Sequence, residues 1–167
     1  MRMVKLVLLG ALAVGGAAGA RAAMGPDARA CDGGSSAFLV NVRGLKAAQG
    51  VLRVQLYGEN PGDFLKKGRK LRRIELPVRG TGAMPVCVAV PRAGTYAVAV
   101  RHDLDGNGKS GWSDGGGFSR NPRLSLIDLK PAHAKVAMAV GGGVRPIDVV
   151  LNYRRGLSIG PVRTARP

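Results

Sequence analysis

Aromatic residues and histidines are scarce in this chain. Only 4% of its 167 residues are Phe, Trp or Tyr. Surfaces that bind single-stranded nucleic acid stack bases on aromatic rings, so this composition argues against such a function. The histidines are His102 and His133, and the two cysteines, Cys31 and Cys87, form neither a CxxC pair nor a Cys/His cluster. Zinc binding and thiol redox catalysis therefore have little support.

Acidic residues are also few. The chain has 10 Asp and Glu against 26 Lys and Arg, which gives a formal net charge of +16. A charge of this size favours anionic partners, such as an anionic envelope lipid, lipopolysaccharide or an acidic glycan, but it indicates no particular fold. Glycine, by contrast, is abundant at 26 residues, which suits a chain with many short turns.

Residues 1–22 have the organisation of a signal peptide. Arg2 and Lys5 precede an uncharged apolar run over residues 6–18, which is short for a bilayer span. Small residues then form two A-x-A cleavage sites that end at Ala20 and Ala22. An uncleaved N-terminal anchor helix is the alternative. The pattern predicts a periplasmic or secreted protein, with no transmembrane span after cleavage and no nucleic-acid partner.

Export agrees with a disulfide between Cys31 and Cys87, because such a bond persists in an oxidising compartment. The chain-entropy model gives a bridge of this span about 4 kcal/mol of stabilisation. Two free thiols or a lipidated Cys31 are the alternatives. Lipidation is disfavoured because Arg29 puts a charge close before Cys31, where a lipoprotein signal has small, apolar residues.

Alternating apolar residues predict a series of short β-strands after a flexible lead-in over residues 23–35. Period-two alternation is the strand signature. The runs cover residues 38–43, 52–57, 86–90, 96–101, 135–140 and 147–152, with a weaker one at 71–78. A helical turn is expected near residues 61–66, and a loose basic tail over 155–167. About seven strands at this spacing indicate one all-β domain, residues 36–154, folded as a two-sheet β-sandwich.

The stretch from residue 102 to 114 resembles a Ca²⁺-binding loop. Oxygen-bearing side chains alternate along it, a glycine follows them, and an Asp occupies the twelfth position. A hard cation takes six to eight oxygen ligands, and this spacing supplies several. The alternative is an Asx-rich turn whose carboxylates cap backbone amides. The candidate ligands are Asp103, Asp105, Asn107, the backbone carbonyl of Lys109, and Asp114.

A second charged feature lies between residues 66 and 73, where six of eight residues are cationic. This density is suited to phosphate or sulfate groups at an anionic surface. The alternative is a solvated basic loop that aids solubility. The candidate anion-binding residues are Lys66, Lys67, Arg69, Lys70, Arg72 and Arg73.

Few residues are candidates for catalysis. His102 is next to Asp103, which could orient it, but no nucleophile is placed beside it by spacing alone. A hydrolase that uses His102 is therefore the weaker alternative. We expect a protein that is not an enzyme and needs no cofactor other than Ca²⁺.

Two motifs together resemble a bacterial family known as domain of unknown function 2141 (DUF2141). The first runs from Gly94-Thr95-Tyr96-Ala97 to His102-Asp103-Leu104-Asp105-Gly106-Asn107-Gly108-Lys109, and the second is Gly117-Phe118-Ser119-Arg120-Asn121. The resemblance implies an exported β-sandwich of immunoglobulin-like or transthyretin-like character in the envelope of Gram-negative bacteria, with no established reaction. It also singles out the motif-loop residues His102, Gly117, Phe118, Ser119 and Asn121. The segment 110–116 is shorter than is usual in the family.

These observations converge on one functional expectation. The chain is expected to be an exported, non-enzymatic binding or structural module for an anionic envelope component. A Ca²⁺-stabilised module that uses the loop 103–114 is the first alternative.

Overall fold

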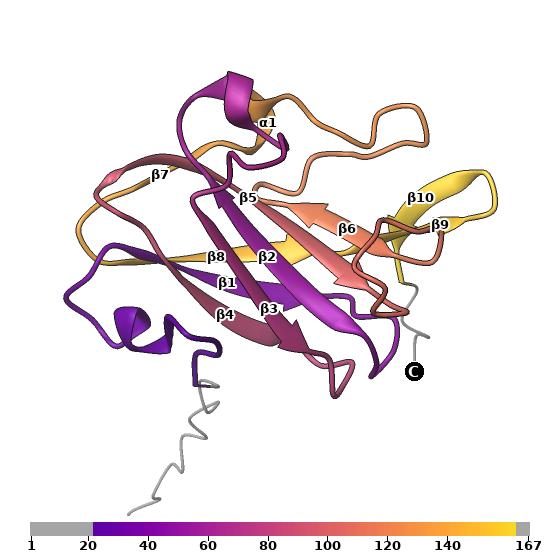
Figure 1. Cartoon of the computed structure of the whole chain (residues 1–167), viewed down its shortest axis with the longest axis horizontal. Helices are drawn as coiled ribbons and strands as arrows, with labels where there is room; N and C mark the ends of the chain where they lie inside the picture. The colour runs from indigo at the N-terminus through magenta and orange to yellow at the C-terminus, as the bar shows by residue number, and fades with distance from the viewer. Residues whose placement is uncertain (1–21, 163–167) are drawn as a thin grey trace, which may run out of the picture.

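The computed structural model describes residues 22–162 and is almost entirely β (Figure 1). Its strands are β1 (Ala37–Arg43), β2 (Val51–Tyr57), β3 (Arg72–Pro77), β4 (Met84–Ala89), β5 (Gly94–Asp103), β6 (Gly115–Phe118), β7 (Met138–Val140), β8 (Val144–Val150), β9 (Asn152–Arg155) and β10 (Ser158–Pro161). Three short helices complete it: η1 (Ala28–Cys31), η2 (Pro61–Asp63) and α1 (His133–Val136). The predicted all-β class is confirmed.

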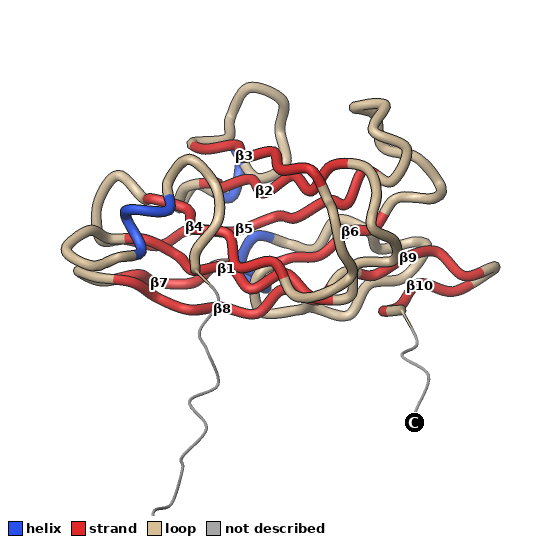
Figure 2. The backbone as a smooth tube through the Cα atoms, turned by 90° about the horizontal axis from the view of Figure 1, so that it is seen from below, coloured by secondary structure: helices blue, strands red, loops and turns tan. Residues whose placement is uncertain are grey.

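The strands form two sheets that pack face to face, as the edge-on view in Figure 2 shows. The smaller sheet has the order β4-β1-β8, with β1 and β8 parallel. The larger sheet has the order β10-β9-β6-β5-β2-β3, and β7 pairs with one end of β5. Together the two sheets make the predicted β-sandwich.

Alternate residues of the strands fill the space between the sheets. Phe38, Val40 and Val42 of β1 are fully buried, and they face Leu52, Val54 and Leu56 of β2 across the core. This alternation is what the period-two sequence pattern predicted. Because a strand's side chains alternate between faces, the same register directs Arg53, Arg101 and Asp103 to the opposite face of the larger sheet.

A second, smaller apolar cluster lies on that opposite face. Its buried members are Tyr57, Ala97, Ala99, Phe118 and Val136. Phe64 and Leu65, which follow η2, and Leu124 pack against it. The cluster fixes the segment after η2 and the segment between β6 and β7 over the outer face of the larger sheet.

The segment before β1 differs from the predicted flexible lead-in. Met24 forms a β-bridge with Val86, and the Asp27 carboxylate accepts hydrogen bonds from Arg72 and from the backbone of Ala89. The predicted disulfide between Cys31 and Cys87 is present. Polar and covalent contacts therefore hold residues 24–31 in place, although their small polar side chains give no strand or helix pattern.

Three further elements differ from the sequence prediction. Val136 ends α1 and is not part of a strand, so β7 begins only at Met138. Residues 152–161 form the β9–β10 hairpin, where a loose tail was predicted from residue 155. β6 was not predicted because three of its four residues are glycine and show no alternation.

The predicted signal peptide and the predicted basic tail both extend beyond the described residues. The signal peptide falls on residues 1–21, outside the described residues except for Ala22, and so do residues 163–167 of the tail. None of the helices within residues 22–162 has the length and apolar character that crossing a membrane requires.

Candidate functional site

The candidate site lies where β5 ends and the loop 104–114 leads into β6. β2 and β6 flank β5 here, with Leu52 and Gly115 opposite His102. Gly50 lies against the backbone at the end of β5, and a Cβ at this position would fall 2.1 Å from the carbonyl oxygen of Asp103. Since its φ is also +76°, only glycine allows this approach without strain.

His102 is fully buried at this point and uses both ring nitrogens in hydrogen bonds. Its Nε2 lies 2.8 Å from the carbonyl oxygen of Gln49, which can only accept, so Nε2 carries the proton. Its Nδ1 lies 2.7 Å from the Tyr153 hydroxyl, which therefore donates to it. The hydroxyl in turn accepts from the backbone N–H of Lys46 at 3.1 Å. His102 thus ties β5 to β9 and to the loop before β2.

This environment also determines the state of Tyr153. Burial raises the pKa of Tyr153 to about 12, although the hydrogen bond from Lys46 acts in the opposite direction. The phenol therefore keeps its proton at neutral pH and can donate it to His102. The arrangement gives the His102 ring a structural task and leaves neither nitrogen directed at solvent.

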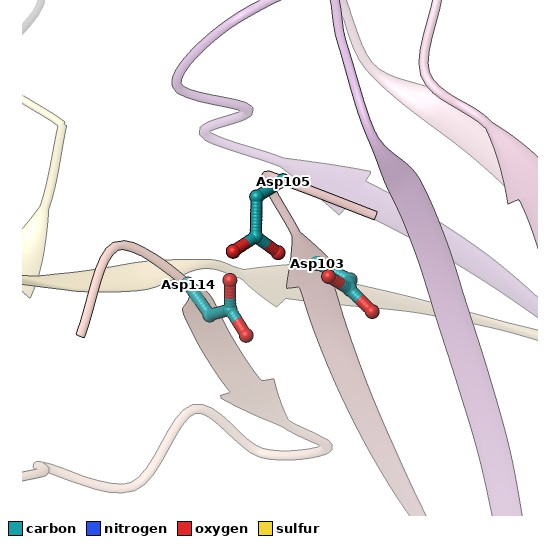
Figure 3. A group of neighbouring side chains, drawn as sticks. All are labelled: Asp103, Asp105 and Asp114. Carbon is teal, nitrogen blue, oxygen red and sulfur yellow. The ribbon is translucent and has the colours of Figure 1, made fainter. Parts of the chain in front are cut away.

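Beyond His102, three carboxylates of the loop turn toward one another, as Figure 3 shows. One oxygen each from Asp103, Asp105 and Asp114 lies within 4.8 Å of the others. Asp103 is buried, Asp114 is half-buried and Asp105 is exposed. The Oδ1 atom of Asp103 is buried without a hydrogen-bond partner among the described residues.

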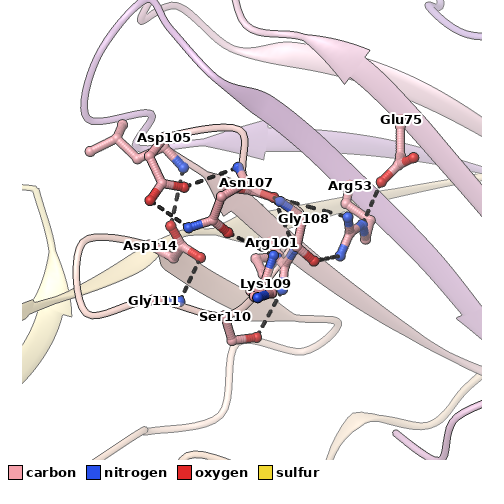
Figure 4. Close-up of polar contacts among 12 residues, drawn as sticks. Arg53, Glu75, Arg101, Asp105, Asn107, Gly108, Lys109, Ser110, Gly111 and Asp114 are labelled. Atoms are coloured by element: carbon pink, nitrogen blue, oxygen red, sulfur yellow. Dashed lines mark hydrogen bonds and ion pairs between the residues drawn. The ribbon is translucent and has the colours of Figure 1, made fainter.

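The remaining carboxylate oxygens hold the loop in shape through backbone amides (Figure 4). Asp103 Oδ2 accepts from Gly108 N–H at 2.9 Å. The two oxygens of Asp114 accept from the N–H groups of Leu104 and Gly111, at 3.1 and 2.9 Å. The Asx-turn alternative is therefore correct for these contacts, and the same contacts pre-organise the carboxylates.

The Asn107 side chain and the backbone N–H of Lys109 form hydrogen bonds within the loop. The Asn107 amide nitrogen donates to Asp105 at 2.6 Å, and its oxygen accepts from the N–H of Lys109 at 2.7 Å. The Lys109 side chain is exposed. Of the five predicted ligands, the three carboxylates lie within 4.8 Å of one another.

Two arginines, the buried Arg53 and the half-buried Arg101, compensate the charge of Asp103. The Arg101 guanidinium lies 3.0 Å from its Oδ2 and that of Arg53 lies 3.9 Å away. Burial acts to raise the pKa of Asp103, but the hydrogen bond from Gly108 and the charges of Arg101 and Arg53 outweigh it, and the pKa lies below its usual range. Asp103 is therefore ionised at neutral pH, as a cation ligand must be.

Sequence reasoning missed Arg53, Arg101 and Tyr153. The two arginines stand opposite each other in β2 and β5, and Arg53 also bonds Glu75 of β3 at 2.6 Å. A charged residue inside a strongly apolar strand was the available signal for each arginine. Tyr153 gave none, because it reaches His102 across 51 residues of sequence.

Within the described structure, three of the six cationic residues in the predicted basic cluster form ion pairs with carboxylates, and three do not. Arg72 pairs with Asp27, Arg73 with Glu75, and Arg69 with Asp63. No ion pair involves the remaining lysines among residues 22–162. These are Lys66, Lys67 and Lys70.

The second sequence motif has structural contacts throughout. Gly117 pairs with Val100 in the sheet and Phe118 belongs to the outer apolar cluster. The buried Ser119 hydroxyl accepts from Val98 N–H at 3.0 Å and donates to the Val136 carbonyl at 2.6 Å. The Asn121 side chain bonds two backbone groups of β8, the carbonyl of Asp148 and the N–H of Val150.

The Tyr153 hydroxyl provides a direct test of the His102 network. Tyr153→Phe removes two hydrogen bonds and leaves His102 Nδ1 buried without a donor, which should lower the free energy of unfolding by about 2 kcal/mol. Urea denaturation at pH 8 measures it. Tyr57→Phe is the matched control, since the Tyr57 hydroxyl has no hydrogen bond within the described residues, and we expect a change under about 0.5 kcal/mol. Equal stability of the two variants would contradict the network's role.

Comparison with known proteins gives one match. No curated protein and no solved structure is detectably similar to the chain. A family model described as an uncharacterized protein conserved in bacteria matches residues 40–148, which include part of β1, all of β2 to β7, most of β8 and the whole Asp loop. Because the match spans well over half of the sequence and includes both motifs, the chain belongs to the DUF2141 family.

Proposed function

We propose that this protein is an exported, non-enzymatic β-sandwich module that binds Ca²⁺ in the loop between β5 and β6. The convergence of Asp103, Asp105 and Asp114 within 4.8 Å carries the proposal. The buried Oδ1 of Asp103, which has no hydrogen-bond partner within residues 22–162, offers an acceptor whose desolvation a cation would offset.

The donor set suits calcium better than a softer metal. All three candidate ligands are carboxylates, and Ca²⁺ takes oxygen ligands in flexible geometry, with water completing the shell. The nearby Arg53 and Arg101 reduce the negative charge around Asp103, and Asp105 is exposed. We therefore infer an affinity near that of extracellular Ca²⁺ modules, with Kd on the order of 1 mM.

Thermal unfolding with and without calcium tests the site. With a Kd of about 1 mM, 10 mM Ca²⁺ should stabilise the folded state by about 1.4 kcal/mol. For a domain of this size, the corresponding rise in Tm is about 3–5 °C. Differential scanning fluorimetry measures it, with EDTA as the reversal and 10 mM Mg²⁺ as the ionic-strength control.

Two variants separate this site from a general effect of salt. Asp114→Asn should abolish the rise in Tm, whereas Asp32→Asn, which removes one exposed acidic charge far from the loop in sequence, should preserve it. A rise of the same size in Asp114→Asn, or none in the wild-type protein, would dispose of calcium binding at this loop.

A second candidate function is association with an anionic envelope component. The observation that favours it is the turn of exposed or half-buried Lys66, Lys67 and Lys70, for which the described structure contains no ion pair. A basic group near an anionic surface contributes about 1 kcal/mol of attraction. Three of them on one turn would give weak, salt-dependent binding.

Replacing Lys66, Lys67 and Lys70 with serine should weaken binding to lipopolysaccharide vesicles at least tenfold at low salt. Replacing Lys109, Lys130 and Lys135 with serine removes the same charge elsewhere and should cost much less. Vesicle co-sedimentation at two salt concentrations measures both variants, and binding should fall as salt rises. Similar losses in the two triple variants would show that net charge alone acts.

We also propose that the protein works in the periplasm after its N-terminal segment is removed. The disulfide supports this, since such bonds persist in oxidising compartments. Among residues 22–162, Met24 is the first with a strand contact, and it lies just after the predicted cleavage sites.

Expression with its own N-terminus in a Gram-negative host should give periplasmic protein that begins at residue 21 or 23. Its two cysteines should react with a thiol reagent only after reduction. Leu9→Arg, which interrupts the apolar run, should leave the protein in the cytoplasm with residues 1–22 attached. N-terminal sequencing decides, and a periplasmic chain that retains Met1 would argue for an anchor.

A further inference from the structure

A groove opens beside β6, on the outer face of the larger sheet, and is lined by the loops that lead into β6 and away from it. Its volume of about 390 Å³ falls within the range of small-ligand sites, about 300–1,000 Å³. The apolar walls come from separate segments of the chain. They are Trp112, Phe118, Leu124, Leu126, Leu129 and Ile159.

Several of these apolar side chains are costly to leave in water. Trp112 is 76% exposed and Leu129 is 49% exposed, although both belong to loops where polar residues are usual. Leucines recur at 124, 126 and 129 in a segment without regular structure. Contiguous exposed apolar surface of this kind marks a binding site in a soluble protein.

The floor of the groove is open because of Gly116. A Cβ at Gly116 would meet no atom within 4 Å, so the glycine leaves free space between the walls. Its neighbour Asn152 of β9 and the guanidinium of Arg101 border the same space. A long, unbranched apolar group could lie along this floor against the leucines.

The charged residues at the rim of the groove determine which head group a bound ligand can carry. Arg154 lines the groove, stacks on the Trp112 ring at 3.4 Å, and has no ion pair in the described part of the chain. Asp114 also lines the groove, but both of its oxygens accept hydrogen bonds from the loop backbone. Arg154 is therefore the charged group at the rim that is placed to pair with a ligand.

From these observations we propose that the groove binds a single-chain amphiphile with an anionic head group, such as a fatty acid. The acyl chain lies over Gly116 between Trp112 and the leucines, and the carboxylate meets Arg154. A glycan fits less well, because four of the six apolar lining residues are leucine or isoleucine and one face of Trp112 is already covered by Arg154. The groove shares Asp114 with the proposed calcium site, but this inference rests on the apolar walls and Arg154 and needs no bound calcium.

Trp112 is the one tryptophan of the chain, so its fluorescence reports on the groove directly. Dodecanoate, added below its micelle concentration to the exported protein, should shift Trp112 emission to shorter wavelength in a saturable manner. Dodecyltrimethylammonium has the same chain and the opposite charge, and it should bind at least tenfold more weakly. Equal affinity for the two, or no saturable shift, would overturn the proposal.

Gly116→Leu places a side chain in the open floor and should weaken dodecanoate binding at least tenfold. Gly141→Leu is the matched control: a Cβ there also meets nothing within 4 Å, but Gly141 does not line the groove, and affinity should stay within twofold. Circular dichroism checks that both variants fold. Unchanged binding by folded Gly116→Leu would refute the proposed position of the chain.

A second pair of variants keeps the test decisive if Gly116→Leu does not fold. Leu129→Glu puts a negative charge in the wall and should abolish binding of dodecanoate, whereas Leu157→Glu, at a 90% exposed position outside the groove, should not. Isothermal titration calorimetry measures both. Binding only to phosphatidylglycerol vesicles, with none to monomeric dodecanoate, would show a membrane surface as the ligand and overturn the proposal.

Discussion

The hydrogen bonds of His102 join three parts of the chain that are distant in sequence. Through Gln49 and Tyr153 the ring fixes the loop before β2 and the strand β9 to the end of β5. The loop 104–114 begins two residues later, so its position depends on this buried contact. Gly50 allows the same approach from the other side, because a side chain there would meet the backbone of Asp103. The site is therefore held by the core of the sandwich, and the loop alone would not position it.

Charge is distributed unevenly over this basic chain. With 10 acidic residues against 26 basic ones, each carboxylate has several possible partners, and Asp27, Asp63 and Glu75 each pair with an arginine. In the loop, however, three carboxylates face one another and only Asp103 has arginines beside it. Like charges this close repel one another unless a cation or a proton lies between them. The arrangement is unusual for a protein so rich in cations, and it distinguishes the loop from the other turns.

Much of the sandwich could be predicted from the sequence because its strands alternate between a buried and an exposed face. β6 could not, since Gly115, Gly116 and Gly117 have no side chains to alternate. The spacing of Asp103, Asp105 and Asp114 correctly suggested that they share one loop, but local spacing carries no information about Arg53, which reaches Asp103 through the register of β2 against β5. Local spacing likewise gave no information about Tyr153, which reaches His102 from β9. The Asn107 side chain bonds Asp105 and the backbone of Lys109, so it also shapes the turn.

The Asn121 side chain affects how readily copies of this protein can pair through the open edges of the smaller sheet. Its amide donates to the carbonyl of Asp148 and accepts from the N–H of Val150, as a neighbouring strand would. On the far edge of the same sheet, Met24 makes the corresponding bonds to β4. Open strand edges are where β-proteins recruit one another into aggregates. With one residue placed on each edge, the smaller sheet is closed to such growth at those points.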